Sequence, residues 1–218
     1  MRAQVVGAAR TAEELGRAFP GIPVRSSGGD RVLATVPDGA ALVVSTPGAE
    51  PLVAGAGYGA ALLLDGWALL SRADLRAGEE TLRRWMAAAA LVRPGGRVVV
   101  GADAGVRAVQ ALVRWDPAGF AERELAERAE VGFPPAVRMA AVTGLAAAVG
   151  GFVASLALPP GAQLIGPVPA GSGDERVLIK VERAHGAEVA VALKAAAAAR
   201  SARKEADPVR IVLDPAQL

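Results

Sequence analysis

Cysteine is absent from this sequence of 218 residues, and histidine occurs only once, at position 185. Without cysteine, the chain can form no disulfide, offers no thiol nucleophile and supplies no thiolate ligand to a metal. One histidine also excludes a metal site built from several imidazole groups. Redox chemistry of thiols and zinc binding are therefore not expected of these residues.

Aromatic residues and net charge are scarce as well. Aromatic residues make up 4% of the chain and charged residues 21%, whereas 52% of the residues are hydrophobic, so the chain can bury a core made mostly of Ala, Val and Leu. The net charge of +2 is too small to predict nucleic-acid binding by itself. No apolar run reaches the roughly 20 residues that span a bilayer, and the N-terminus lacks a signal-peptide pattern. We expect a cytoplasmic protein with no membrane partner.

Short apolar runs alternate with amphipathic segments in the first half of the chain. The predicted strands are 4–7, 32–36, 41–44, 60–64 and 97–100. The predicted helices are 11–19, 75–92 and 105–115. Continuous apolar runs separated by helices favour a parallel sheet covered on both faces. We therefore expect residues 1–115 to form one open α/β domain.

The second half of the chain has a different order of predicted helices and strands. After a boundary at Asp116-Pro117, an amphipathic helix is predicted over 120–131, ending at Gly132. The elements predicted after it are strand 138–143, helix 145–156, strands 163–168 and 176–182, helix 186–203 and strand 209–213. This order, βαββαβ, is that of a split-βαβ or ferredoxin-like domain. We expect it to occupy residues 116–218 as an α+β domain.

The sequence contains no complete copy of three common ligand-binding motifs. The chain contains no Gly-x-x-x-x-Gly-Lys-[Ser/Thr] string, which a P-loop needs to surround phosphate with backbone N–H groups. The VVGAAR string at 5–10 offers one glycine where a dinucleotide turn requires three. The LVRPGGR string at 91–97 is similar to a turn of methyltransferases, but the glycine-rich first loop of those enzymes is missing.

Candidate functional residues fall into an acidic and a basic set. Asp65, Asp74, Glu79 and Asp103 stand near strand ends, where open sheets bind ligands, but turn chemistry explains them as well. His185 precedes Gly186 at a predicted helix start, which favours a surface cap over a catalyst. The candidate nucleic-acid contacts are Lys180, Arg183, Lys194, Arg200, Arg203 and Lys204. Several of these cations would also complement the dipole at a helix end.

A series of short strings resembles the PriA family of replication-restart helicases, also called primosomal protein N′. The FAERELAER helix at 120–128 with Gly132-Phe-Pro-Pro135, the IGPVP turn at 165–169 and the VLDP ending at 212–215 are similar to the C-terminal domain of that family. The strings at 11–20 and at 64–65 with 73–79 are similar to its second helicase lobe. The resemblance implies a RecA-like second lobe followed by a C-terminal domain similar to ribosomal protein S-ten.

The departures from the family pattern concern the motor. The family's QVAGRAGR motif is absent from residues 87–94, where it would be expected. Leu91 and Pro94 stand near the positions at which the family has arginines. Those cations would stabilise the charge of phosphoryl transfer. Val44-Ser-Thr-Pro-Gly48 likewise lacks the family's glutamine. The family's zinc-binding cysteines and ATP-binding first lobe are not in this chain, so we expect no cofactor here and no ATPase activity.

The resemblance implies a DNA-binding and scaffold function at stalled replication forks, where the family promotes reloading of the replicative helicase. Its implied partners are forked or single-stranded DNA, other primosome proteins and the single-stranded DNA-binding protein. Two alternatives stay open from the sequence: a small α/β enzyme such as a methyltransferase, or a module that binds only proteins.

Overall fold

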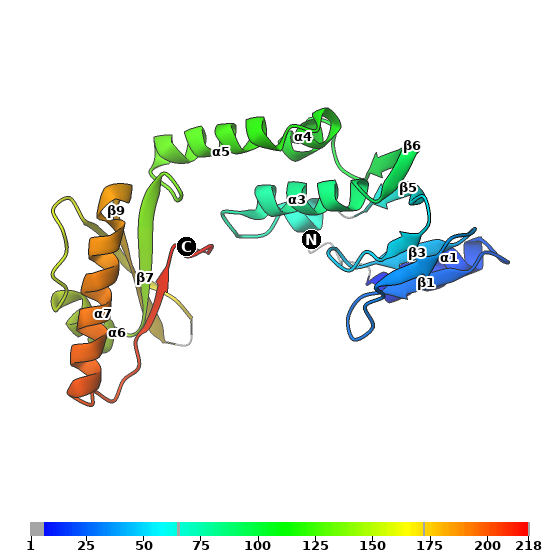
Figure 1. Cartoon of the computed structure of the whole chain (residues 1–218). Coiled ribbons are helices and arrows are strands. Elements are labelled where there is room, and N and C mark those ends of the chain that lie inside the picture. Colours follow the sequence, from blue (N-terminus) through cyan, green and yellow to red (C-terminus); the bar gives the residue numbers. More distant parts are fainter. Residues whose placement is uncertain (1–6, 65, 172, 218) are drawn as a thin grey trace. The chain divides into compact units, whose positions relative to one another are not determined.

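The computed structural model describes residues 7–64, 66–171 and 173–217, which form two compact units divided between Phe120 and Ala121. The division falls within helix α5 (Pro117–Val131). The predicted ranges, 1–115 and 116–218, instead divide the chain just before that helix. Figure 1 shows the elements in chain order. Each unit is described by itself below.

The strands of the N-terminal unit form three separate parallel pairs. They are β1 (Val24–Ser27) with β3 (Leu42–Ser45), β2 (Thr35–Pro37) with β4 (Leu52–Ala54), and β5 (Tyr58–Leu63) with β6 (Val92–Val100). The prediction of one open sheet is wrong for the described residues, because no strand of one pair is hydrogen-bonded into another pair. An apolar run indicates a strand but does not specify its neighbour. The predicted strand 4–7 lies almost wholly outside the described residues.

Four helices accompany these strands: α1 (Ala8–Ala18), α2 (Gly66–Leu70), α3 (Ala77–Ala89) and α4 (Arg107–Arg114). Helix α1 contacts β1 and β3, whereas α3 contacts α2, α4 and the β5–β6 pair. The core contains Leu63, Leu82, Trp85, Leu112 and Phe120. The aromatic Trp85 is thus a central part of this core, although aromatic residues are few in the chain.

The outer face of the β5–β6 pair is bare. Leu62 and Val99 are register partners and are 65% and 56% exposed, whereas the adjacent Leu63 is 8% exposed. Alternate residues of a strand point to opposite faces, so one face packs inside the unit and the other faces outward. The prediction that both faces would be covered is wrong for this pair.

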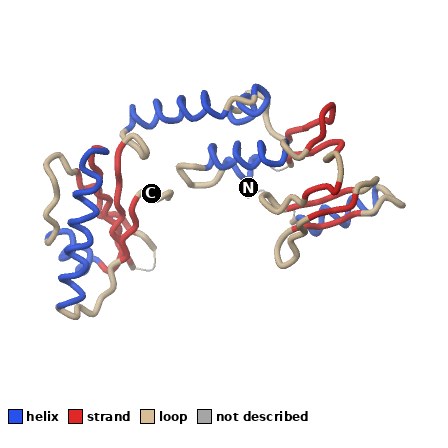
Figure 2. Tube along the Cα trace, in the orientation of Figure 1, coloured by secondary structure: helices blue, strands red, loops and turns tan. Residues whose placement is uncertain are grey.

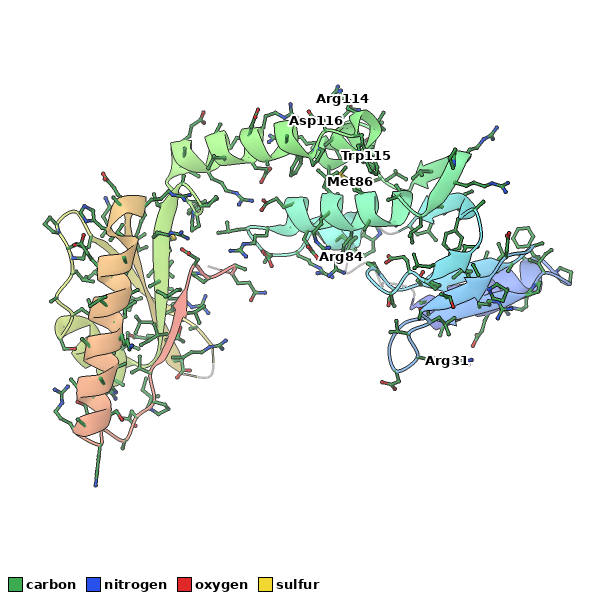
Figure 3. The ribbon with its side chains drawn as sticks, viewed as in Figure 1. Arg31, Arg84, Met86, Arg114, Trp115 and Asp116 are labelled. Atoms are coloured by element: carbon green, nitrogen blue, oxygen red, sulfur yellow. The ribbon has the colours of Figure 1, made fainter. Side chains whose placement is uncertain are left out.

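The turn between α4 and α5 has a defined geometry (Figure 3). Trp115 adopts a left-handed conformation with φ 53°, which ends α4. Asp116 then accepts a hydrogen bond on Oδ1 from the Gly119 N–H at 2.8 Å. A carboxylate in this position, followed by proline at the first helical residue, is a favourable helix start. The Asp116-Pro117 pair, which is expected to mark a domain boundary, therefore begins α5.

The C-terminal unit has the predicted βαββαβ order. Figure 2 shows its helices in blue and its strands in red. Its elements are β7 (Val137–Leu145), α6 (Ala146–Ala154), β8 (Gln163–Pro169), β9 (Asp174–Glu182), the 3-10 turn η1 (Arg183–His185), α7 (Gly186–Ala202) and β10 (Arg210–Leu213). One four-stranded sheet has the order β10-β7-β9-β8, and all its neighbouring strands are antiparallel. This topology is the split-βαβ arrangement.

Helices α6 and α7 cover one face of this sheet. Val142 and Ile179 from the strands pack with Phe152 of α6 and with Val189 and Leu193 of α7 in a continuous buried cluster. The residues that alternate with Val142 and Ile179 belong to the opposite face. Within the described part of the chain, no helix is both long and apolar enough to cross a membrane.

Candidate binding site

The six cations proposed as nucleic-acid contacts do not form one cluster. Arg183 precedes the first residue of α7, Lys194 is exposed in the middle of that helix, and Arg200, Arg203 and Lys204 stand at its end. Helix α7 has 17 residues and is therefore about 25 Å long. Lys180 lies on β9 instead. The structure thus separates one group at the start of α7 from another at its end.

The group at the end of α7 is largely engaged within the chain. Arg200 and Arg203 both form ion pairs with Glu205, and the Arg203 pair measures 2.8 Å between Nε and Oε1. The hydrogen bond from Arg203, together with the charge of both guanidinium groups, lowers the pKa of Glu205. Glu205 therefore stays ionised and offsets part of the positive charge. Cations at the C-terminal end of α7 also interact favourably with the helix dipole.

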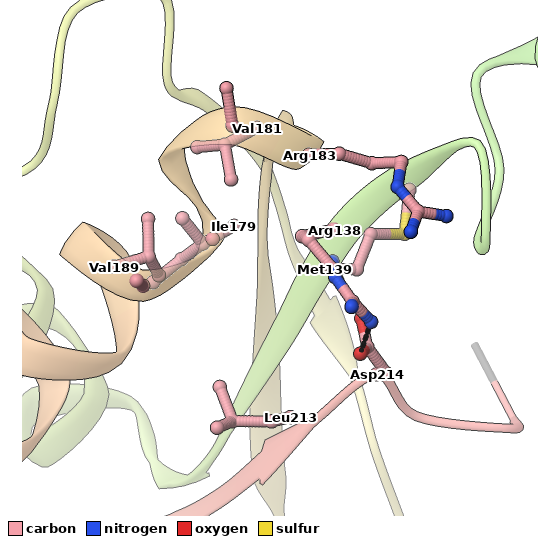
Figure 4. A pocket seen from close by; sticks show the side chains of 11 residues that line it. Arg138, Met139, Ile179, Val181, Arg183, Val189, Leu213 and Asp214 are labelled. Carbon is pink, nitrogen blue, oxygen red and sulfur yellow. Dashed lines mark hydrogen bonds and ion pairs between the residues drawn. The ribbon is translucent and has the colours of Figure 1, made fainter.

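A pocket of about 420 Å³ lies at the start of α7 (Figure 4). It forms where the first residues of β7 lie beside the last residues of β9 and β10. The antiparallel register brings these residues to the same end of the sheet. Its apolar lining comes from Met139, Ile179, Val181, Val189 and Leu213. Its charged lining comes from Arg138, Arg183 and Asp214.

Three contacts fix the charged side of the pocket. Arg138 forms an ion pair with Asp214, and Arg183 donates a hydrogen bond from Nη1 to the Pro135 carbonyl oxygen at 2.7 Å. A Cβ atom on Gly186 would lie 2.8 Å from Cγ of Arg138, so the absence of a side chain at Gly186 lets the stem of Arg138 pass the start of α7. Both guanidinium groups are thereby held at the N-terminus of α7. The helix dipole stabilises a negatively charged group at this end of the helix.

The charged side chains in the lining are groups that can bind an ionic ligand. Asp214 is the one carboxylate in its lining, and this group is already paired with Arg138. The lining contains no hydroxyl, thiol or imidazole group that could act as a nucleophile or general base. His185 is not in the lining, and its Nδ1 lies 2.9 Å from Oε1 of Glu188. His185 is the N-cap residue of α7, but its side chain makes no capping bond to the backbone.

The acidic candidates support turns where they are described. Oδ1 of Asp74 accepts a hydrogen bond from the Arg76 N–H, and Oδ1 of Asp103 accepts one from the Gly105 N–H, each at 2.7 Å. Glu79 lies in the first turn of α3, where a carboxylate interacts favourably with the helix dipole. Asp65 lies outside the described residues. Among those residues, no group of three potential ligands could hold a metal ion.

The strings that carry the family resemblance have structural roles here. Phe120 is buried in the N-terminal core, whereas Glu124 and Arg128 form an ion pair at 2.9 Å, and Arg128 also reaches the Pro134 carbonyl at 3.4 Å. Gly166 has φ 108°, and a Cβ atom on it would lie 2.8 Å from the Arg176 carbonyl oxygen. Asp214 supplies the pocket's ion pair. No sequence pattern predicts a role for Arg138 or Asp214, although Asp214 lies within one of these strings.

The chain thus combines an α/β N-terminal unit with a C-terminal unit of split-βαβ topology that carries a pocket at the start of α7. Residues 129–216 match the family described as "Primosomal protein N C-terminal domain". The chain is 51% identical over 230 residues to the probable replication restart protein PriA of Mycobacterium leprae (strain TN), covering 99% of the chain and 35% of that relative. Against its counterpart in Mycobacterium tuberculosis (strain ATCC 25618 / H37Rv), identity is 50% over 237 residues, covering 99% and 36%.

Residues 129–216 belong to the family of PriA C-terminal domains, and the whole chain, which is similar to PriA replication restart proteins, spans about a third of the length of the curated relatives it matches. This membership does not favour the methyltransferase. The LVRPGGR string that suggested a methyltransferase has another explanation in the structure. Residues 93–96 bulge from β6, since Val92 pairs with Tyr58 and Arg97 pairs with Ala60.

Proposed function

We propose that this chain acts in replication restart as a DNA-binding and scaffold part without ATPase activity of its own. The observation that carries the proposal is the match of almost the whole chain to PriA proteins at about half identity. In this proposal the N-terminal unit corresponds to the second helicase lobe. Its parallel strand pairs and accompanying helices support that correspondence, since RecA-like lobes are built from parallel strands and helices.

The missing motor residues support the absence of ATP hydrolysis. Residues 87–94 form the end of α3 and the start of β6, and they contain Arg93 as their one cation. A motor requires several cations around the nucleotide to stabilise charge in the transition state. In this proposal the lobe serves as a scaffold at a stalled fork.

An ATPase measurement tests the proposal directly. We expect hydrolysis by the purified chain to stay at background with and without forked DNA. A PriA protein that retains the QVAGRAGR motif serves as the positive control. Turnover that co-purifies with the chain and rises with DNA would overturn the scaffold function.

A second function, recognition of an acidic partner segment, is supported by the pocket at the start of α7. Its apolar floor and two arginines suit a peptide end that carries hydrophobic side chains and a carboxylate. Backbone N–H groups at the helix start would add further donors. The single-stranded DNA-binding protein is the first partner to test, because the family resemblance implies it.

A peptide titration separates this function from general attraction between charges. We expect Arg183→Ala to weaken binding of a short acidic peptide with a free C-terminus about tenfold, as removal of one charge-assisted hydrogen bond does. Lys194→Ala, which removes an exposed cation from the middle of α7, is the matched control. Equal losses in both variants, or none in either, would contradict recognition in the pocket.

A further inference from the structure

The sheet face opposite α6 and α7 carries an ordered pattern of side chains that the proposed function does not yet use. Strand register sets residues side by side in rows across the sheet. The three rows are Arg210, Thr143, Arg176 and Val168; then Val212, Ala141, Leu178 and Ile165; then Met139, Lys180 and Gln163. Two rows that contain cations therefore flank one apolar row.

The three cations of this face, Arg176, Lys180 and Arg210, form no ion pair with the described residues. Arg176 is half-buried, and its Nε is a buried nitrogen that makes no hydrogen bond with the described residues. A guanidinium group in this situation is stabilised by an anion that binds its remaining N–H groups. The acidic residues of the face, Asp174 and Glu182, stand at the two ends of β9, outside the rows.

The absence of a side chain at Gly132 leaves space for the side chain of Lys180. A Cβ atom on Gly132 would lie 2.6 Å from Nζ of Lys180, so a side chain at this position would displace the ammonium group. Gly132 also has φ 64°, a conformation that favours glycine. The same Gly132 that ends α5 therefore leaves space for one of the three cations.

The spacing and composition of the face indicate the kind of ligand. Arg210 and Arg176 are two strands apart, about 10 Å, and Lys180 is four residues from Arg176 along β9, about 13 Å. The rows contain no aromatic side chain on which bases could stack. They do offer cations for phosphates and two neutral polar groups in Thr143 and Gln163. In the apolar row, Ala141 is buried, whereas Ile165 is 42% exposed and can contact a sugar or an unpaired base. A duplex would present no unpaired base to that row.

We propose that this open sheet face binds the phosphate backbone of single-stranded DNA through Arg176, Lys180 and Arg210. The proposal rests on the proposed function, because that function places the chain at stalled forks. It assigns the DNA contact to the sheet rather than to the cations along α7, and it leaves the pocket at the start of α7 to another ligand.

Two matched triple variants test the assignment in the full chain. The face variant carries Arg176→Gln, Lys180→Gln and Arg210→Gln; the helix variant carries Lys194→Gln, Arg203→Gln and Lys204→Gln. Each removes three positive charges. Fluorescence anisotropy with labelled oligodeoxythymidine, at two or more salt concentrations, reports both affinity and salt dependence.

We expect the face variant to bind roughly 100-fold more weakly at 0.1 M salt, with a salt slope smaller by about 2, since each lost phosphate contact on a single strand removes about 0.7 from that slope. The helix variant should keep the slope of the unmodified chain. Thermal unfolding of each variant establishes that it is folded. If the face variant does not fold, Arg210→Gln alone, at an exposed position, should weaken binding about fivefold.

The lysines provide a second test without any mutation. Lysine occurs at positions 180, 194 and 204 and nowhere else in the chain. Oligodeoxythymidine should protect Lys180 from acylation by an amine-reactive ester, whereas Lys194 and Lys204 should react as they do without DNA. Mass spectrometry of the proteolytic peptides measures the three positions in one sample.

The possible failures are distinguishable. If the unmodified chain binds no single-stranded DNA, both this proposal and the DNA-binding half of the proposed function fail. If it binds, but the face variant binds equally well or Lys180 is not protected, only the assignment to the sheet face is overturned. A loss confined to the helix variant would return the contact to the end of α7.

Discussion

The two units of this chain differ in how their strands pair. The C-terminal unit joins four antiparallel strands into one sheet and buries one face under two helices. The N-terminal unit keeps its strands in parallel pairs and builds its core mainly from α3, α4 and the first turn of α5. Antiparallel sheets tolerate one open face, whereas parallel strands are normally covered on both. The open face is therefore an ordinary feature of the C-terminal unit but an unusual one of β5 and β6.

The comparison predicts that a core truncation in the C-terminal sheet has the largest effect. Ile179 is fully buried, and Ile179→Ala should lower the free energy of unfolding by about 2–5 kcal/mol. Calorimetry should show the loss in the transition of the C-terminal unit. Leu164→Ala is the control, because Leu164 pairs with Ile179 across the sheet but is half exposed; an equal loss there would contradict the importance of burial.

In the N-terminal unit, a single buried hydroxyl has a comparable structural role. Ser27 donates a hydrogen bond to the Ala49 carbonyl oxygen at 2.6 Å and accepts one from the Leu33 N–H at 3.0 Å. Ser27→Ala leaves both groups unsatisfied and should cost about 1–3 kcal/mol in chemical denaturation. The neighbouring Ser26 is exposed, so Ser26→Ala should leave the midpoint nearly unchanged.

The helix that crosses the division between the units depends on its cap. Asp116→Ala removes the acceptor for the Gly119 N–H at the start of α5 and should cost about 1 kcal/mol. Asp116→Asn keeps a capping oxygen and should retain most of the stability. Both values can be obtained from urea titrations, and an equal loss in the two variants would exclude capping as the cause.

The smallest expected effect is a response of the N-terminal unit to acid. Hydrogen bonds from Arg83 and Arg84 lower the pKa of Glu80 from 4.5 to about 2. Because the folded state favours the ionised form, this stabilisation is present above pH 4.5 and is lost as the pH falls from 4.5 through about 2. The Glu80→Gln variant should therefore show a shallower loss of thermal stability over that interval.

A second variant isolates the cause of this response. With Glu80 replaced, further changes of Arg83 and Arg84 to Gln should not alter the acid dependence, since the carboxylate they bind is gone. A further change in the slope would assign the acid response to other groups that these arginines contact.

Several elements could be predicted because local signals suffice for them. The alternation of residues 176–182 and the turn before them predict β9, and the alanine-rich segment predicts α7 within one residue of its observed end. The apolar pattern does not predict β1, whose VRSS sequence has only one apolar residue, or β4, whose apolar LVA run is only three residues long. The start of β6 was placed too late, because Pro94-Gly-Gly96 resembles a helix stop but is a bulge within the strand.

The candidate site could be predicted only in part. The sequence pointed to Lys180 and Arg183 among its cations, and the structure places Lys180 on the open sheet face and Arg183 in the pocket. Arg138 and Asp214 are 76 positions apart, and no local pattern connects them. Arg176 and Arg210 were not selected either, because their shared row exists only through the pairing of each with Thr143.

The sequence by itself therefore determined the family, the absence of the motor motifs and the order of elements in the C-terminal unit. These properties follow from short strings and from the period of apolar residues, which are local in the chain. Only the tertiary structure decided which strands pair, which sheet face stays open and which cations share it. Those outcomes depend on register between segments far apart in the chain, and a shift of one residue in register would move each side chain to the opposite face of the sheet.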